Sequence, residues 1–160
     1  MKLKTFLGMV LCAAALFAFT SCDNGNGDGL VLVGNYDMYM GEITATQGTS
    51  VFKDNGIVVE LTFNNAAQSV NMVMNQVKFA EAMPVRLDIA IDGLSFTKTD
   101  KKVVITGDNI IPTALGGPFE KYIITRFSGT LDAEGNLVFD MLCGGMPVNY
   151  IGEVIQLSIE

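Results

Sequence analysis

From Tyr36 onward, apolar and polar residues alternate with a period of two, and short groups of turn residues separate the alternating runs. The clearest run reads Ile57, Val59, Leu61 and Phe63 at every second position. Such a period is that of a β-strand with one buried and one wetter face. No window shows a convincing 3.6-residue repeat over three turns, so amphipathic helices are not expected. The sequence therefore predicts an all-β chain.

The alternating runs predict about eight to ten antiparallel strands. They cover residues 36–46, 57–63, 70–75, 85–92, 94–99, 102–106, 121–131, 137–143 and 148–159. Hairpin turns are expected at residues 54–56 (Asp-Asn-Gly) and 132–136 (Asp-Ala-Glu-Gly-Asn), because Asn and Gly accept the positive φ of tight turns. The segment from Gly107 to Phe119 interrupts this regular spacing and is expected to lie over one end as a crossover loop or a lid. Alternation alone fits a sandwich as well as an up-and-down barrel.

The first 22 residues have the layout of a signal peptide. Lys2 and Lys4 precede an apolar stretch from Phe6 to Phe19, which is shorter than the roughly 20 residues that span a bilayer. The sequence Phe19-Thr20-Ser21-Cys22 resembles a bacterial lipobox, in which the Cys becomes the acylated first residue of the mature protein. Residues 1–21 are therefore predicted to be a lipoprotein signal peptide, and Cys22 is the predicted lipidation site and membrane anchor.

The mature chain divides into a tether and one domain. Residues 23–29 are only Asp, Asn and Gly, so residues 22–33 are expected to form the lipidated Cys and a flexible tether. Asn24, Asn26 and Asp28 follow the start of a calcium-loop pattern, but Asn35 stands where its bidentate Glu is required, so no metal site is expected. Residues 34–160 form the predicted barrel domain. The expected location is the cell envelope, at the outer membrane, with the periplasmic or surface face left open.

Composition argues against catalysis. The chain has no His, which removes His-based triads and most catalytic zinc sites, and no Gly-x-Ser-x-Gly elbow is present. Asp88 and Asp92 lie about 13 Å apart along one strand, too far for a glycosidase pair, although a cross-strand pair of Asp88 with Glu60 stays open. Cys143 lies in an apolar run and is expected to be a buried, inert thiol. We expect no enzyme activity and no cofactor.

Charge limits the partners. Loss of residues 1–21 leaves eight basic and 17 acidic residues, a net charge of −9, which disfavours nucleic acid because phosphate contacts need clustered Lys and Arg.

A set of Met and aromatic residues lies in phase with the apolar positions of the predicted strands, so these side chains are expected to face one interior. Met is flexible and polarisable, and a Met-rich lining can adapt to hydrophobic guests. The more common role of such residues is to fill irregular gaps in a closed core. The candidate ligand-binding residues are Tyr36, Met38, Met40, Phe63, Met72, Met74, Phe139 and Met141.

The chain also resembles a family of small lipoproteins of Gram-negative bacteria with a calycin-like, lipocalin-like β-barrel. The resemblance covers residues 34–154 and rests on three segments: Gly34-Asn35-Tyr36, residues 127–132 (Phe-Ser-Gly-Thr-Leu-Asp) with Gly135-Asn136-Leu137, and residues 146–152 (Met-Pro-Val-Asn-Tyr-Ile-Gly). It implies an antiparallel up-and-down barrel with an interior ligand cavity. Lipocalins proper open with Gly-x-Trp, whereas this chain has Tyr36 and no Trp.

Three functions follow as hypotheses. The first is a membrane-anchored lipoprotein whose barrel binds a small hydrophobic ligand. The second is an acidic interaction or inhibitor protein that docks a basic protein partner. The third is a structural subunit of an envelope assembly.

Overall fold

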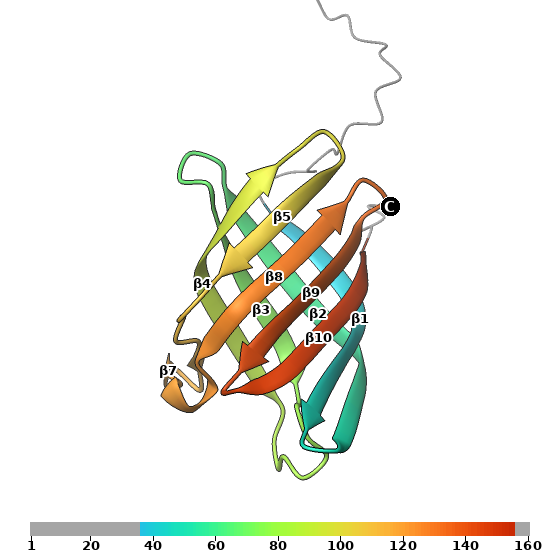
Figure 1. Ribbon diagram of the computed structural model, residues 1–160, viewed down its shortest axis with the longest axis vertical. Coiled ribbons are helices and arrows are strands. Elements are labelled where there is room, and N and C mark those ends of the chain that lie inside the picture. The colour runs from blue at the N-terminus through green and yellow to red at the C-terminus, as the bar shows by residue number, and fades with distance from the viewer. Residues whose placement is uncertain (1–35, 156–160) are drawn as a thin grey trace, which may run out of the picture.

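The computed structural model describes residues 36–155 (Figure 1). The predicted signal peptide, Cys22 and the tether lie outside these residues. Eight antiparallel strands form a closed barrel in which neighbours in the ring follow one another along the chain, and β10 returns to pair with β1. The barrel strands are β1 (Tyr36–Gln47), β2 (Ser50–Asn64), β3 (Ser69–Val77), β4 (Leu87–Lys98), β5 (Lys102–Gly107), β8 (Ile124–Asp132), β9 (Asn136–Cys143) and β10 (Met146–Val154).

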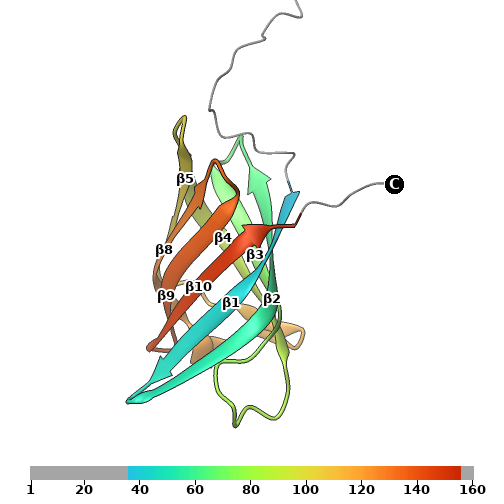
Figure 2. The same ribbon diagram turned by 90° about the vertical axis from the view of Figure 1, so that its right-hand side faces the viewer.

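This arrangement confirms the all-β, up-and-down barrel and excludes a sandwich, because the ring contains every pairing from β1–β2 to β10–β1. The barrel is compatible with a calycin-like fold. Between β5 and β8 the chain forms a small hairpin, β6 (Thr113–Ala114) and β7 (Gly117–Pro118), and one 3-10 turn, η1 (Glu120–Tyr122). Figure 2 shows the wall formed by β9, β10, β1 and β2. No helical segment among residues 36–155 is long and apolar enough to cross a membrane.

One predicted turn is wrong. Asp54-Asn55-Gly56 lies inside β2, and the hairpin between β1 and β2 turns instead at Gly48-Thr49. Glu42 pairs with Asn55 while Gly41 pairs with Ile57, so Gly56, with φ of +73°, is the extra residue of a β-bulge. A glycine that accepts positive φ serves a bulge as well as a turn, and the local sequence does not distinguish them.

A second bulge explains why two predicted strands, 85–92 and 94–99, are one strand, β4. Gly93 has φ of +77° and donates its N–H to the side-chain oxygen of Asn71 at 2.9 Å. The turn at residues 132–136 is confirmed, since Asp132 Oδ1 accepts the N–H of Asn136 at 2.8 Å and Gly135 has φ of +87°.

The inward side chains of all eight strands form one apolar core. Phe139 stacks on Phe127 at a centroid distance of 5.1 Å and on Tyr150 at 5.0 Å. The Tyr150 hydroxyl donates to the Ile57 carbonyl oxygen at 3.2 Å, which satisfies the polar end of this ring inside the barrel. Phe79 and Phe119 both contact Tyr122 of η1, with ring centroids 5.9 and 4.8 Å apart.

Candidate functional site

Five of the eight candidate ligand-binding residues face the interior. Phe63, Met72, Met74, Phe139 and Met141 are all buried, with exposed fractions between 0 and 3%. Their strands place them there because β2, β3 and β9 alternate inward apolar and outward residues. The prediction of an inward Met and aromatic cluster is confirmed for these positions, and their use as a ligand lining stays a prediction.

The other three residues lie on the outside, so their predicted inward orientation is wrong. Tyr36 and Met40 are 48% and 50% exposed, Met38 is half-buried, and Tyr39 takes the inward place beside Val59. The first strand carries apolar residues on both faces, and alternation alone therefore leaves its phase open. The pairing with β2 decides it.

With this orientation of β1, Asp37 and Tyr39 lie on the inner face of the barrel and Tyr36 lies on the outer face. Asp37 pairs with Leu61 on the inner face, and burial raises the pKa of its carboxyl above the usual range. Burial also raises the pKa of Tyr39. On the outer face, the Tyr36 hydroxyl donates to Glu60 at 2.8 Å.

The ladder between β4 and its neighbours is interrupted on one side of the barrel. β5 pairs with β4 only over Ser95–Lys98, although it pairs with β8 along its whole length. Over residues 87–94, the edge of β4 that faces away from β3 is paired at one position, where Ala90 pairs with Thr113 of β6. Residues 87–94 of β4 and the start of β8 are therefore not joined by a direct ladder, and we call this interruption the seam.

Residues 108–123 cover the seam. The segment is attached at Ile110, whose N–H and carbonyl exchange hydrogen bonds with Ile124 at 3.0 and 2.7 Å. Asp108 accepts the N–H of Arg126 at 3.2 Å, and Phe119 donates to Pro112 at 2.8 Å. The sequence predicted that residues 107–119 lie over one end as a loop or a lid. β6 instead pairs alongside β4, while the 3-10 turn that follows lies at one end of the barrel, where Tyr122 contacts Phe79 of the β3–β4 loop and Ile123 accepts the N–H of Gly144 (Figure 1).

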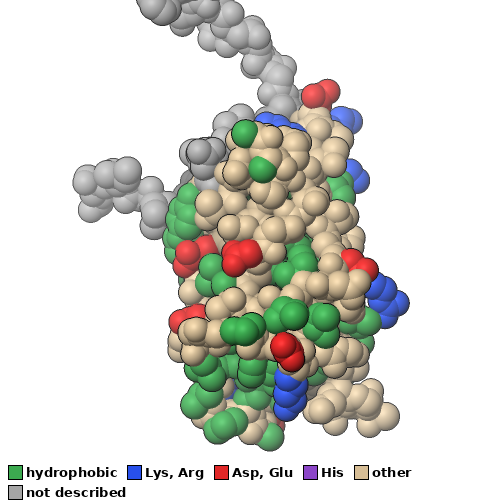
Figure 3. Space-filling model, turned by 90° about the vertical axis from the view of Figure 1, so that its left-hand side faces the viewer, with side chains coloured by type: hydrophobic (Ala, Val, Ile, Leu, Met, Phe, Trp, Pro, Cys, Tyr) green, Lys and Arg blue, Asp and Glu red, His purple; other side chains and the backbone are tan. Residues whose placement is uncertain are grey.

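A hollow of about 440 Å³ lies where the β6–β7 hairpin meets the outer surface of β3 and β4. Its lining combines apolar and polar side chains. The lining residues are Val73, Gln76, Arg86, Leu87, Asp88, Ala90, Thr113, Ala114, Leu115 and Gly116. Figure 3 shows this side of the molecule, with hydrophobic side chains gathered over its lower half. Two other hollows, of about 310 and 550 Å³, lie on the β8–β9–β10–β1 wall and at the β2–β3 turn.

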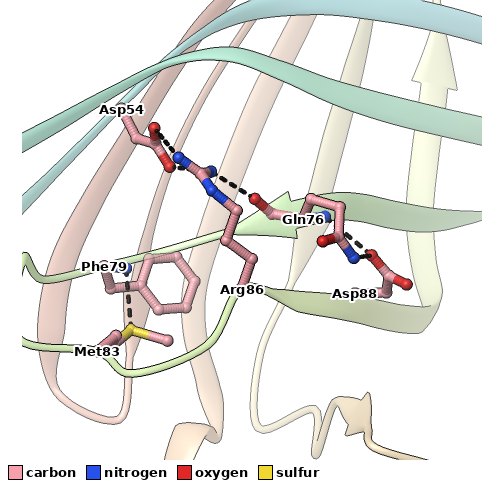
Figure 4. A network of polar contacts seen from close by, with 6 residues as sticks. All are labelled: Asp54, Gln76, Phe79, Met83, Arg86 and Asp88. Atoms are coloured by element: carbon pink, nitrogen blue, oxygen red, sulfur yellow. Dashed lines mark hydrogen bonds and ion pairs between the residues drawn. The ribbon is translucent and has the colours of Figure 1, made fainter.

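A polar network joins three of the residues that line this hollow, Gln76, Arg86 and Asp88 (Figure 4). Arg86 donates two hydrogen bonds to Asp54, at 2.6 and 2.9 Å, and a third to the Gln76 carbonyl at 2.7 Å. The bond to Asp54 raises the pKa of Arg86. Gln76 donates its N–H and its side-chain amide to one oxygen of Asp88, each at 2.8 Å, and the backbone bond is the main reason that the pKa of Asp88 is lowered. Asp88 and Glu60 are thus engaged with different partners.

Neither Arg86 nor Leu115 was predicted to take part in a site. The positive φ of Gln76 and Leu115, +50° and +54°, belongs to the folded backbone and has no signature in residue type.

Two further kinds of group bear on chemistry: the single cysteine of the barrel and clusters of possible metal ligands. Burial raises the pKa of the Cys143 thiol to about 12, so at neutral pH it is protonated. Among residues 36–155 no three His, Cys, Asp or Glu side chains gather into a metal-binding group. The arrangement offers a packed apolar interior, a seam with a covering segment, and a half-apolar hollow beside it.

No known family model, no curated protein and no solved structure matches this chain.

Proposed function

We propose that this protein is a lipoprotein of the cell envelope, tethered through Cys22, whose barrel binds a small hydrophobic molecule that enters through the seam. The proposal includes membership of the calycin-like lipoprotein family that the sequence resembles. The observation that carries it is the short ladder between β4 and β5, which leaves residues 87–94 of β4 and the start of β8 without direct pairing. Elsewhere in the ring, opening the wall breaks a run of backbone hydrogen bonds, whereas at the seam it breaks few.

The interior chemistry supports the same proposal. A guest has to displace packed side chains, because Met72, Met74 and Phe139 show no exposure to solvent. Met is suited to this, since its unbranched side chain has three rotatable bonds and repacks around guests of different shape. Apolar burial would supply the affinity.

A reversible lock tests the proposal. Ala90 of β4 and Thr113 of β6 are direct partners where the covering segment joins the edge of the seam, so Ala90→Cys with Thr113→Cys is suited to a disulfide. In a Cys143→Ala chain that starts at Asp23, we expect saturable micromolar binding of cis-parinaric acid in the reduced state. Oxidation should slow association at least about tenfold, and reduction should restore it.

The matched control places the same disulfide in a continuous ladder. Thr130 and Val138 are direct partners between β8 and β9, and locking them should leave association unchanged. Absence of saturable binding in the reduced protein contradicts the binding function. Binding that is equally fast with the seam locked contradicts only the route.

An acidic docking function is the second candidate. Residues 36–155 carry 14 acidic and eight basic side chains, which favours a basic protein partner. Such docking weakens as salt rises, whereas apolar burial does not, so retention on a cationic protein such as lysozyme at low and high salt separates the two functions.

A further inference from the structure

Large apolar side chains are exposed in the segments that line the hollow beside the seam and next to them along the chain. Leu115 is 80% exposed, Val85 53% and Ile111 46%. Leu115 lines the hollow itself, Val85 precedes its lining residue Arg86, and Ile111 belongs to the segment that covers the seam. They account for three of the large apolar side chains that are exposed among residues 36–155.

Leu115 occupies a conformation that does not suit it. It is the first residue of the two-residue turn between β6 and β7, with φ of +54°, followed by Gly116 with φ of +81°. Turns of this kind favour Asn, Asp or Gly, because the side chain of any other residue crowds the backbone at positive φ. Leu here strains the backbone and exposes apolar surface, so its presence is not explained by the stability of the barrel.

The tether allows this tip to meet a bilayer. Fourteen residues, from Cys22 to Asn35, precede β1, and their extended length is at most about 50 Å. β1 has 12 residues and is about 40 Å long, so the fully extended tether is longer than this strand. A barrel anchored at Cys22 can therefore lie on its side with the β6–β7 hairpin at the membrane surface.

The net charge of the barrel indicates which kind of lipid surface it can approach. The described residues have a net charge of −6, and the hollow itself is lined by one carboxylate, Asp88, and one guanidinium, Arg86, which is paired with Asp54. Anionic headgroups are repelled by this charge, whereas a zwitterionic surface is not. Because the one cation that lines the hollow, Arg86, is already paired with Asp54, the apolar tip suits insertion between zwitterionic headgroups.

From these features we propose that the β6–β7 hairpin docks on a zwitterionic lipid surface by inserting Leu115, supported by Ile111 and Val85. This inference rests on the proposed tethering, and it places the seam against the bilayer, where a hydrophobic ligand would be taken up or released.

The chain has no Trp, so a single introduced Trp reports insertion directly. The chain from Asp23 to Glu160 contains the complete ring of eight strands and is the form to use. With Leu115→Trp, phosphatidylcholine vesicles should shift the emission to the blue, and brominated lipid should quench it. Ile151→Trp is the matched control, because Ile151 is 58% exposed on β10, opposite β4 in the ring. Its emission should not change.

A second variant separates docking from folding. Leu115→Asn places a residue that tolerates positive φ at the turn, so the unfolding midpoint should stay or rise while partitioning into vesicles falls about tenfold. Partitioning should be insensitive to salt and weaker on vesicles that contain phosphatidylglycerol.

Three outcomes overturn the inference: Leu115→Asn partitions as the unaltered chain does, brominated lipid quenches both Trp variants equally, or the emission of the Leu115→Trp variant shifts with protein concentration and without lipid. The last outcome identifies a second copy of the chain as the occupant. None of these measurements uses a ligand, so their failure is distinct from failure of the cis-parinaric acid assay.

Discussion

Substitution of Phe139 tests whether the barrel interior is a filled core or a cavity that can hold a ligand. Its ring lies between Phe127 and Tyr150 and is fully buried. Phe139→Ala should therefore cost about 3–5 kcal/mol of the free energy of unfolding, measured with urea, because it leaves a cavity in a packed stack. Met72→Leu, which nearly conserves volume, should cost less than about 1.5 kcal/mol. A loss below about 1 kcal/mol for Phe139→Ala would show that the ring already borders empty space.

The bonds from Gln76 to Asp88 predict a small acid sensitivity. Because the folded pKa of Asp88 is lowered, the carboxylate stabilises the fold above its unfolded pKa of about 3.9, and this stability is lost as the pH falls through the folded value. Asp88→Asn should flatten the dependence of the unfolding midpoint on pH in this acid range. Asp92→Asn, on the same exposed face of β4, is the control. Parallel profiles for Asp88→Asn and the unaltered protein would contradict the assignment.

At the scale of elements, the seam should be the least protected part of the wall. Amides of β4 that face β6, together with those of the β6–β7 hairpin, are held by isolated pairs. Native-state hydrogen exchange should therefore be faster there than in β9 and β10, whose ladder runs from Met146↔Cys143 to Glu153↔Asn136. Uniform protection around the ring would remove the structural basis for a route through the seam.

The element scale also shows where sequence reasoning ends. The run at residues 57–63 and the turn at 132–136 were predictable, because alternation and turn chemistry are local properties. Gly56 and Gly93 were misread as boundaries, since a bulge needs the same backbone freedom as a turn and differs only in the partner strand. The small β6–β7 hairpin, with two residues a strand, is too short to have a periodic signal.

For the whole molecule, Cys143 reports unfolding of the closed barrel. Its thiol is 1% exposed, and burial raises its pKa to about 12, so at pH 8 the folded protein should react with a thiol reagent only when the barrel opens. In the chain from Asp23, the labelling rate should follow the denaturant dependence of global unfolding. Rapid labelling without denaturant would show that the β8–β9 wall opens locally.

Alternation and turn residues by themselves determined that this chain is all-β and antiparallel, since both depend on neighbours along the sequence. They also placed Met72, Met74 and Met141 on inward faces, because every inward position of β3 and β9 is apolar whereas their outward positions mix polar and apolar residues. Tertiary structure alone decided that Tyr36 and Met40 face outward, that the sheet closes, and that residues 108–123 cover a seam. Each of these depends on which strand lies alongside, and strand pairing is a property of the closed ring that no local pattern contains.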